Sequence, residues 1–143
     1  MPKGERLSVV LDTGPLVALL DAADEHHAWA ATEFSRFEGV VRICEAVLTE
    51  SLFLLRSRRP AQEKILEWVE LGELTCDFVL PDEARAIRAL WRRYANVPMS
   101  LADACVVRMA ELHPRSVICT VDSDFSIYRK DGRHPLNLLT PQR

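Results

Sequence analysis

The chain has 143 residues, which is short enough for one domain and long enough to bury a hydrophobic core. Its residues are 48% hydrophobic and 27% charged, as in ordinary globular proteins, and its formal net charge of −3 excludes nucleic-acid binding through bulk basicity. We therefore expect a single globular domain over residues 1–143.

The basic residues and the cysteines each suggest something about the protein's setting. Of the 18 basic residues, 15 are arginine, which suits phosphate contacts but also follows from a high genomic G+C content. The four cysteines form no C-x-x-C pair, which argues against a zinc site and favours buried thiols in a reducing cytosol. No signal-peptide pattern and no apolar run of membrane-spanning length occurs, so we expect a cytoplasmic protein without a membrane partner.

Short apolar runs and helical patterns alternate along the chain. Strands are predicted over residues 7–11, 40–44, 73–80, 116–121 and 136–139, with a weaker signal at 73–80. Helices are predicted over residues 16–20, 25–38, 46–58, 60–71, 82–94 and 100–112, and a short helical turn begins at residue 122. This alternation predicts an α/β fold with a parallel sheet covered on both faces, whose strands all end at one edge.

Two acidic residues fall at that edge. Asp12 ends the first apolar run, and Asp122 follows the run at 116–121. Aspartate before glycine also favours a turn, and Asp122 is placed to cap the helical turn that follows, with Asp124 as its neighbour. A turn aspartate normally faces water, whereas Asp12 closes a fully apolar run, which favours a functional role.

Two further acidic residues lie on predicted helices. Glu50 is the only charged residue between Glu45 and Arg56, and it lies on the flank of the apolar face. Asp103 follows Ser100 by three positions, as in a capping box with Asp in place of Glu, and its charge suits the first turn of a helix. Capping is compatible with catalysis, and both interpretations of Asp103 stay open.

Carboxylates that converge on one crevice repel one another, so they must take up protons or bind cations. A site of carboxylate oxygens without His or Cys selects hard ions such as Mg²⁺ or Mn²⁺ over zinc. Such ions position a water molecule and neutralise a phosphodiester under in-line attack. The hydroxyls of Thr13 and Thr120 are placed to orient the carboxylates or a bound water.

These residues resemble the PIN-domain family of metal-dependent nucleases, and most closely its small single-domain members, the VapC-type toxins of toxin–antitoxin pairs. The first and last motifs are the specific ones, and the similarity covers nearly the whole chain. Its motifs are Val10 to Asp21, Asp24 to His27, Thr49-Glu50, Leu101 to Ala104, and Thr120 to Phe125.

The resemblance implies a three-layer α/β/α sandwich with a mostly parallel five-stranded sheet. It implies an acidic quartet that binds Mg²⁺ or Mn²⁺ and cleaves RNA, made of Asp12, Glu50, Asp103 and Asp122, with Asp124 as a second, more variable acid of the last motif. It also implies a homodimer and a cognate antitoxin protein that inserts a segment over the site. Hydrolysis by a metal-activated water would leave a 3′-hydroxyl and a 5′-phosphate.

Other classes of protein match less well. Asp12-Thr13-Gly14 is also the aspartic-protease triplet, but that enzyme needs two triplets in an all-β setting. A HAD-type phosphatase would place a second Asp where Gly14 stands, and no glycine-rich phosphate loop is present. The remaining alternative is a catalytically inactive PIN-like module that binds RNA or protein, and such a module need not bind divalent ions.

RNA contacts would have to come from arginines near the crevice. Two sets are candidates: Arg56, Arg58 and Arg59, which follow Glu50 on the same predicted helix, and Arg85, Arg88 and Arg92, which recur at helical spacing. Asp82 and Glu83 in the helix predicted over 82–94 favour instead a solvated, salt-bridged face for Arg85, Arg88 and Arg92.

The adjacent residues His26 and His27 point apart on a helix, so we interpret them as surface or packing residues rather than a metal pair.

Overall fold

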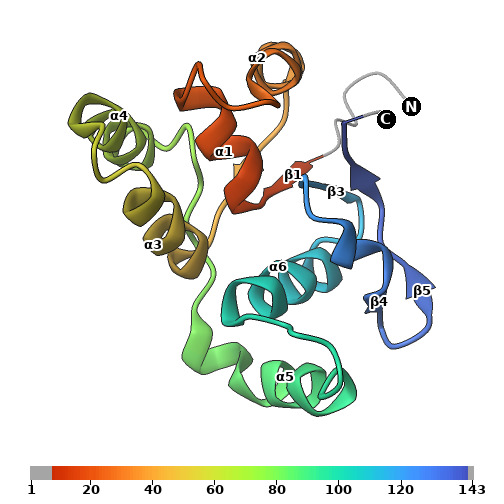
Figure 1. Ribbon diagram of the computed structural model, residues 1–143. Helices are drawn as coiled ribbons and strands as arrows, with labels where there is room; N and C mark the ends of the chain where they lie inside the picture. Colours follow the sequence, from red (N-terminus) through yellow and green to blue (C-terminus); the bar gives the residue numbers. More distant parts are fainter. Residues whose placement is uncertain (1–7, 142–143) are drawn as a thin grey trace.

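The computed structural model describes residues 8–141, and its centre is a parallel sheet in the strand order β2-β1-β3-β6 (Figure 1). The strands are β1 (Ser8–Leu11), β2 (Val41–Arg42), β3 (Ser116–Cys119) and β6 (Leu138–Leu139). In the register of the two central strands, Leu11 lies opposite Cys119. This pairing brings the residues that follow β1 and β3 to the same edge of the sheet.

Within residues 8–141, six α-helices surround the sheet. They are α1 (Thr13–Leu20), α2 (His27–Arg36), α3 (Glu45–Leu54), α4 (Arg59–Glu70), α5 (Leu80–Arg93) and α6 (Leu101–Leu112). A short 3-10 helix, η1 (Ser123–Ser126), follows β3. In Figure 1, α1 and α2 lie on one side of β1 and β3, and α5 and α6 lie on the other. The predicted α/β sandwich is therefore confirmed.

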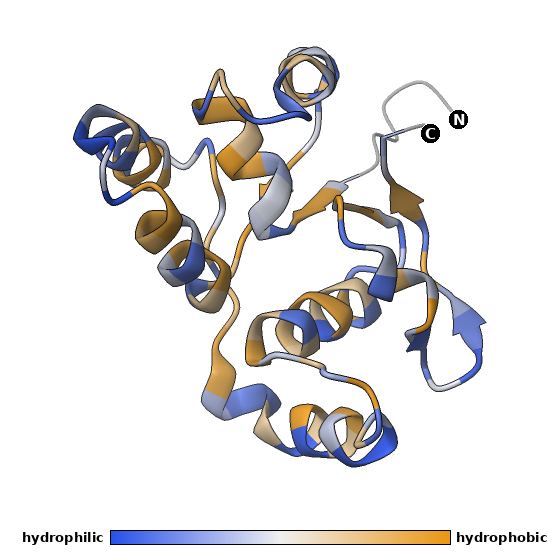
Figure 2. Ribbon diagram, viewed as in Figure 1, coloured by the Kyte–Doolittle hydropathy of each residue, from blue (hydrophilic) through white to orange (hydrophobic). Residues whose placement is uncertain are grey.

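The hydrophobic core lies between β1, β3 and helix α6. Val10 and Leu11 of β1 have no exposed surface. Eight residues of α6 are buried as well, because its largely apolar sequence packs into the centre of the protein rather than on its surface. Figure 2 shows β1, β6 and parts of α1, α3 and α6 among the hydrophobic parts of the ribbon, whereas the last two short strands before β6 are hydrophilic. Full burial of a side chain such as Leu11 contributes about 1.5–3 kcal/mol. This packing holds both strand ends and the start of α6 in fixed positions.

The predicted strand over residues 73–80 is wrong, and the sheet has four strands rather than five among the described residues. Only Thr75 pairs with β2, where its N–H donates to the Val41 carbonyl at 2.7 Å and its own carbonyl accepts from Ile43 at 3.0 Å. Gly72, with φ +76°, turns the chain after α4, and Pro81 already lies in the first turn of α5. The segment between them has room for one bridge, not for a strand.

A two-stranded antiparallel hairpin, β4 (Arg129–Lys130) with β5 (His134–Pro135), was not predicted. Its turn contains Asp131 at φ 53° and Gly132 at φ 77°. An Asp-Gly pair is the strongest short-range signal for such a turn, because both residues tolerate the left-handed region. The signal was present in the sequence, but the flanking strands are only two residues long.

None of the helices in the part of the chain that the structure describes is long and apolar enough to cross a membrane.

The start of α1 lies very close to the segment after β3. A Cβ atom at Gly14 would overlap the side chain of Val121, so Gly14→Ala is expected to lower the free energy of unfolding by about 1–3 kcal/mol. Denaturant titration measures this loss. The double variant Gly14→Ala/Val121→Ala should recover most of it, because the overlapping methyl group is then absent. A Gly14→Ala protein as stable as the parent would contradict the close packing.

Candidate active site

Asp12 and Asp122 lie at the carboxyl edge of the two central strands and share one hydroxyl. Asp12 follows β1 and precedes α1, and its N–H donates to the Cys119 carbonyl at 3.0 Å. The hydroxyl of Thr120, which directly follows β3, donates to Asp12 Oδ2 at 2.7 Å and accepts from the Asp122 N–H at 2.9 Å. Thr120 is fully buried, so it joins the two acidic segments inside the protein.

Asp12 is only 6% exposed, and burial is the main reason why its pKa is raised from 3.8 to about 6. The negative charges of Asp103 and Asp122 raise this pKa further, while the hydrogen bond from Thr120 lowers it. The structure therefore brings three of the predicted acids within electrostatic reach of one another.

Asp103 both caps helix α6 and belongs to this acidic group. The Ser100 hydroxyl accepts from the Asp103 N–H at 3.0 Å, and Asp103 Oδ2 accepts from the Ser100 N–H at 3.4 Å, so the capping box is present. The same oxygen accepts a hydrogen bond from the hydroxyl of Tyr128 at 3.0 Å. Burial raises the pKa of Asp103, and the charge of Asp122 adds to this effect.

Glu50 and Asp124 contact neighbours of the Asp12 and Asp103 carboxylates rather than those carboxylates themselves. Glu50 is exposed on α3, and its Oε2 accepts from the hydroxyl of Thr13 in the first turn of α1 at 2.9 Å. The N–H of Asp124 donates to Asp122 Oδ1 at 2.9 Å, so Asp122 also caps η1. The hydroxyls of Thr13 and Thr120 thus do contact carboxylates, as their positions in the sequence suggested.

Tyr128 is a site residue that the sequence analysis missed. It follows η1, is fully buried, and packs edge-on against Phe125 and Tyr94, with ring centroids 5.3 and 5.1 Å away. A buried tyrosine hydroxyl needs a partner, and here that partner is Asp103. No local pattern identifies this contact, because it joins residues 25 positions apart.

Replacing Tyr128 by phenylalanine removes one donor from the Asp103 carboxylate and keeps the aromatic packing. We expect the free energy of unfolding to fall by about 1 kcal/mol and divalent-ion affinity to fall about 10-fold. Calorimetric titration of Mn²⁺ into Tyr128→Phe and parent protein measures the second effect. Tyr94→Phe serves as a matched control, because the Tyr94 hydroxyl accepts from the Arg129 N–H instead of contacting an acid.

The donor set fits a hard cation, although the carboxylates do not form a complete cage. No three His, Cys, Asp or Glu side chains among residues 8–141 lie close enough to hold a metal ion. Mg²⁺ is usually bound through one or two carboxylates and keeps several water ligands. Asp12 and its acidic neighbours Asp103 and Asp122 would be the residues to hold such an ion, through their carboxylate oxygens.

The structure does not bring the predicted arginines to the acids. Helix α3 ends at Leu54, so Arg56, Arg58 and Arg59 lie beyond it and not on the helix of Glu50. Arg56 lies over the Phe53 ring at 4.3 Å, and Arg58 pairs with Asp21 at 2.9 Å. In the described part of the chain, no ion pair joins these residues to the acidic quartet.

The second arginine set lies on the outer part of the sandwich. Arg85, Arg88 and Arg92 are exposed on α5, and α6 lies between α5 and β1 (Figure 1). Their position fits a solvated face at least as well as an RNA-binding one, and their role stays a prediction.

Comparisons with known proteins agree with this architecture. The family model for the PIN domain matches residues 9–131. The chain is similar in structure to VapC20 of Mycobacterium tuberculosis, a toxin that cleaves the sarcin–ricin loop. The two sequences are 22% identical, the TM-score is 0.73, and the match covers 83% of this chain and 93% of VapC20. It is also similar to FitAcB from Neisseria gonorrhoeae, with 16% identity and a TM-score of 0.53 over 80% of this chain and 88% of that one. No curated protein matches.

Proposed function

Since the chain belongs to the PIN-domain family, we propose that it is a VapC-type endoribonuclease that hydrolyses RNA phosphodiester bonds with the help of Mg²⁺ or Mn²⁺. The observation that carries this proposal is the crowding of carboxylates where β1 and β3 end. Asp12 is buried beside the charges of Asp103 and Asp122, and this arrangement is costly unless a cation offsets it.

The acids of the quartet would bind the cation, and hydrogen bonds from neighbouring hydroxyls would orient the carboxylates. A bound divalent ion would activate water and offset the charge of the phosphodiester. Above pH about 6, Asp12 is ionised, and the Thr120 hydroxyl fixes the orientation of its carboxylate. Tyr128 does the same for Asp103, and Thr13 for Glu50.

The ends of the RNA products follow from this arrangement. Because a water molecule and not the ribose 2′-hydroxyl attacks, cleavage leaves a 3′-hydroxyl and a 5′-phosphate.

The proposal includes the partners that the resemblance implies. We expect an antitoxin protein that covers the site, a homodimer, and one domain over residues 1–143 that acts in the cytoplasm. Similarity to the VapC20 toxin and to FitAcB at 22% and 16% identity supports the fold and leaves the RNA substrate open.

The test is calorimetric titration of Mn²⁺ into chelator-treated protein, with Asp12→Asn and Asp103→Asn beside the parent. Asp82→Asn on the exposed start of α5 is the matched control. We expect saturable binding that Asp12→Asn and Asp103→Asn lose and Asp82→Asn keeps. RNA cleavage by the parent should then yield 3′-hydroxyl and 5′-phosphate ends.

Two results would oppose the proposal. A 2′,3′-cyclic phosphate product would exclude water as the nucleophile. The absence of Mn²⁺ binding at millimolar concentration would favour the catalytically inactive PIN-like module instead.

A further inference from the structure

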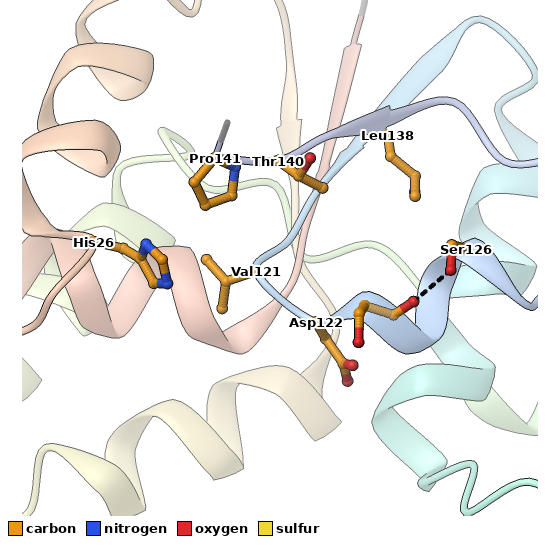
Figure 3. A pocket seen from close by; sticks show the side chains of 8 residues that line it. His26, Val121, Asp122, Ser126, Leu138, Thr140 and Pro141 are labelled. Atoms are coloured by element: carbon orange, nitrogen blue, oxygen red, sulfur yellow. Dashed lines mark hydrogen bonds between the residues drawn. The ribbon is translucent and has the colours of Figure 1, made fainter. Parts of the chain in front are cut away.

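A pocket of about 400 Å³ opens beside Asp122 (Figure 3). Its walls come from three separate segments: the connection between α1 and α2 with His26, the segment that leads from β3 into η1 with Val121 and Ser123, and the chain after β6 with Thr140 and Pro141. The volume falls in the range of about 300–1,000 Å³ that is typical of small-molecule pockets. We call it the His26 pocket.

The His26 ring forms one wall of this pocket and is held in place by its own segment. The ring lies edge-on to Trp29, with centroids 6.5 Å apart, and its Nε2 lies 3.3 Å from Glu25 Oε1. The backbone N–H of His26 donates to Asp24 Oδ1 at 2.8 Å. Its side chain keeps 32% of its surface exposed. Figure 3 shows the imidazole facing Val121, with the Pro141 ring close by. A flat ring and two apolar side chains therefore form one side of the pocket.

The other side of the pocket is polar but carries no positive charge. Among the described lining residues there is no lysine or arginine, and the carboxylate of Asp122 is the only acid. The Ser126 hydroxyl donates its hydrogen to the Ser123 carbonyl at 2.7 Å, so it remains only as an acceptor, whereas the hydroxyls of Ser123 and Thr140 can donate to a ligand as well. Such a lining repels a phosphate group and suits a neutral ring with hydrogen-bonding edges.

We propose that the His26 pocket binds one base of single-stranded RNA, from a nucleotide that flanks the scissile phosphate. Unpaired RNA bases are commonly splayed out, stacked on aromatic side chains that include histidine, and hydrogen-bonded at their edges. His26 supplies the stacking surface, and Ser123 and Thr140 supply hydroxyls. Because Asp122 lies both in the pocket and beside Asp12, a base held here places its phosphate next to the acidic group.

This inference rests on the proposed ribonuclease function and adds a determinant of base preference to it. The test must therefore separate base binding from cleavage. The chain has four histidines, so the ring signals in an NMR spectrum are few, and the His26 signal is assigned by its loss in His26→Ala. We would titrate the four ribonucleosides, which carry no phosphate for the acids to repel, one at a time into the full chain in chelator.

At least one ribonucleoside should shift the His26 ring signal in a saturable way and leave that of His134, which is exposed on β5, unchanged. His26→Ala should weaken binding roughly 5- to 100-fold, the range for loss of one stacked base. His26→Phe should restore much of the affinity because it keeps a flat ring, and His134→Ala is the matched control. Thermal melts of each variant check that the fold is intact.

The proposal would be overturned if none of the four ribonucleosides shifted the His26 signal at millimolar concentration, and a protein segment would then be the alternative occupant of the pocket. Ribonucleoside binding that His26→Ala does not weaken would also overturn it.

Cleavage of a random-sequence RNA pool separates the two claims. If the parent cleaves and His26→Ala shows the same base preference, the pocket assignment is wrong and the ribonuclease proposal stands. If ribonucleosides bind at His26 and no divalent ion supports cleavage, the pocket binds a base but the ribonuclease proposal is wrong.

Discussion

Asp12→Asn is expected to lower RNA cleavage more than about 100-fold, because loss of a neighbour that merely orients a metal ligand already costs about 10- to 100-fold. Asn keeps the shape of the side chain and an oxygen that accepts from the Thr120 hydroxyl, so the fold should remain. Cleavage kinetics at saturating Mg²⁺ measure the loss. If Asp12→Asn kept more than a tenth of the parent cleavage rate, Asp12 would not have the central role that the proposed mechanism gives it.

The same substitution should change stability in a direction that depends on pH. The pKa of Asp12 is raised from 3.8 to about 6, so the folded chain holds this proton more tightly than the unfolded chain. The resulting stabilisation is complete below pH 3.8 and disappears as the pH rises through about 6. At about 1.36 kcal/mol per pH unit, the difference is on the order of 3 kcal/mol.

In chelator at pH 8, Asp12→Asn should therefore unfold at a higher urea concentration than the parent, and this advantage should shrink towards pH 4. Parallel urea titrations at both pH values provide the comparison. A melting temperature clearly below that of the parent at pH 8 would contradict the crowding of acids around Asp12.

Thr120→Val is expected to have the second largest effect. Thr120 has no exposed surface, and its hydroxyl serves Asp12 and the Asp122 N–H together. Valine has nearly the same shape but leaves both groups without this partner, so we expect a loss of roughly 2–4 kcal/mol in the free energy of unfolding. Cleavage should fall about 10- to 100-fold, because the carboxylate of Asp12 is no longer oriented.

Thr120→Ser is the matched control, since it keeps the hydroxyl and loses one methyl group, at a cost of about 1 kcal/mol. Chemical denaturation and cleavage kinetics of Thr120→Val and Thr120→Ser should rank Ser above Val in both. Equal activity of the two variants would mean that the methyl group, and not the hydroxyl, matters at this position.

The sequence predicted the positions of the acids that follow strands better than the contacts that hold them. Asp12 and Asp122 end apolar runs, and parallel strands bring such ends together without detailed knowledge of the packing. Tyr128 depends on how η1 folds back onto α6, and no local pattern carries that information. The hydroxyl that supports Asp103 was therefore not predicted, although the capping function of Asp103 was confirmed.

Two further features of the structure were difficult to predict from the sequence because they depend on short segments. The segment at 73–80 has an apolar composition, but one bridge at Thr75 is all that fits between Gly72 and Pro81. The interpretation of the two adjacent histidines as surface or packing residues fits both: His27 Nδ1 lies 2.8 Å from the Ala18 carbonyl oxygen, and the His26 ring lies edge-on to Trp29. The pocket beside His26 was not predicted, because a wall assembled from three distant segments leaves no periodic signal in any one of them.

Three carboxylates of the acidic group, those of Asp12, Glu50 and Asp103, each accept a hydrogen bond from a hydroxyl. Their rotamers are thus chosen when the chain folds, before any ligand arrives. Immobilising a side chain on binding costs about 0.5–1.5 kcal/mol, and under the proposed function a cation that binds carboxylates already ordered in this way would avoid most of that entropy loss. The entropy of ordering these carboxylates is lost during folding. A substitution that removes one of the three hydroxyls is therefore expected to weaken cation binding even though every acid is still present.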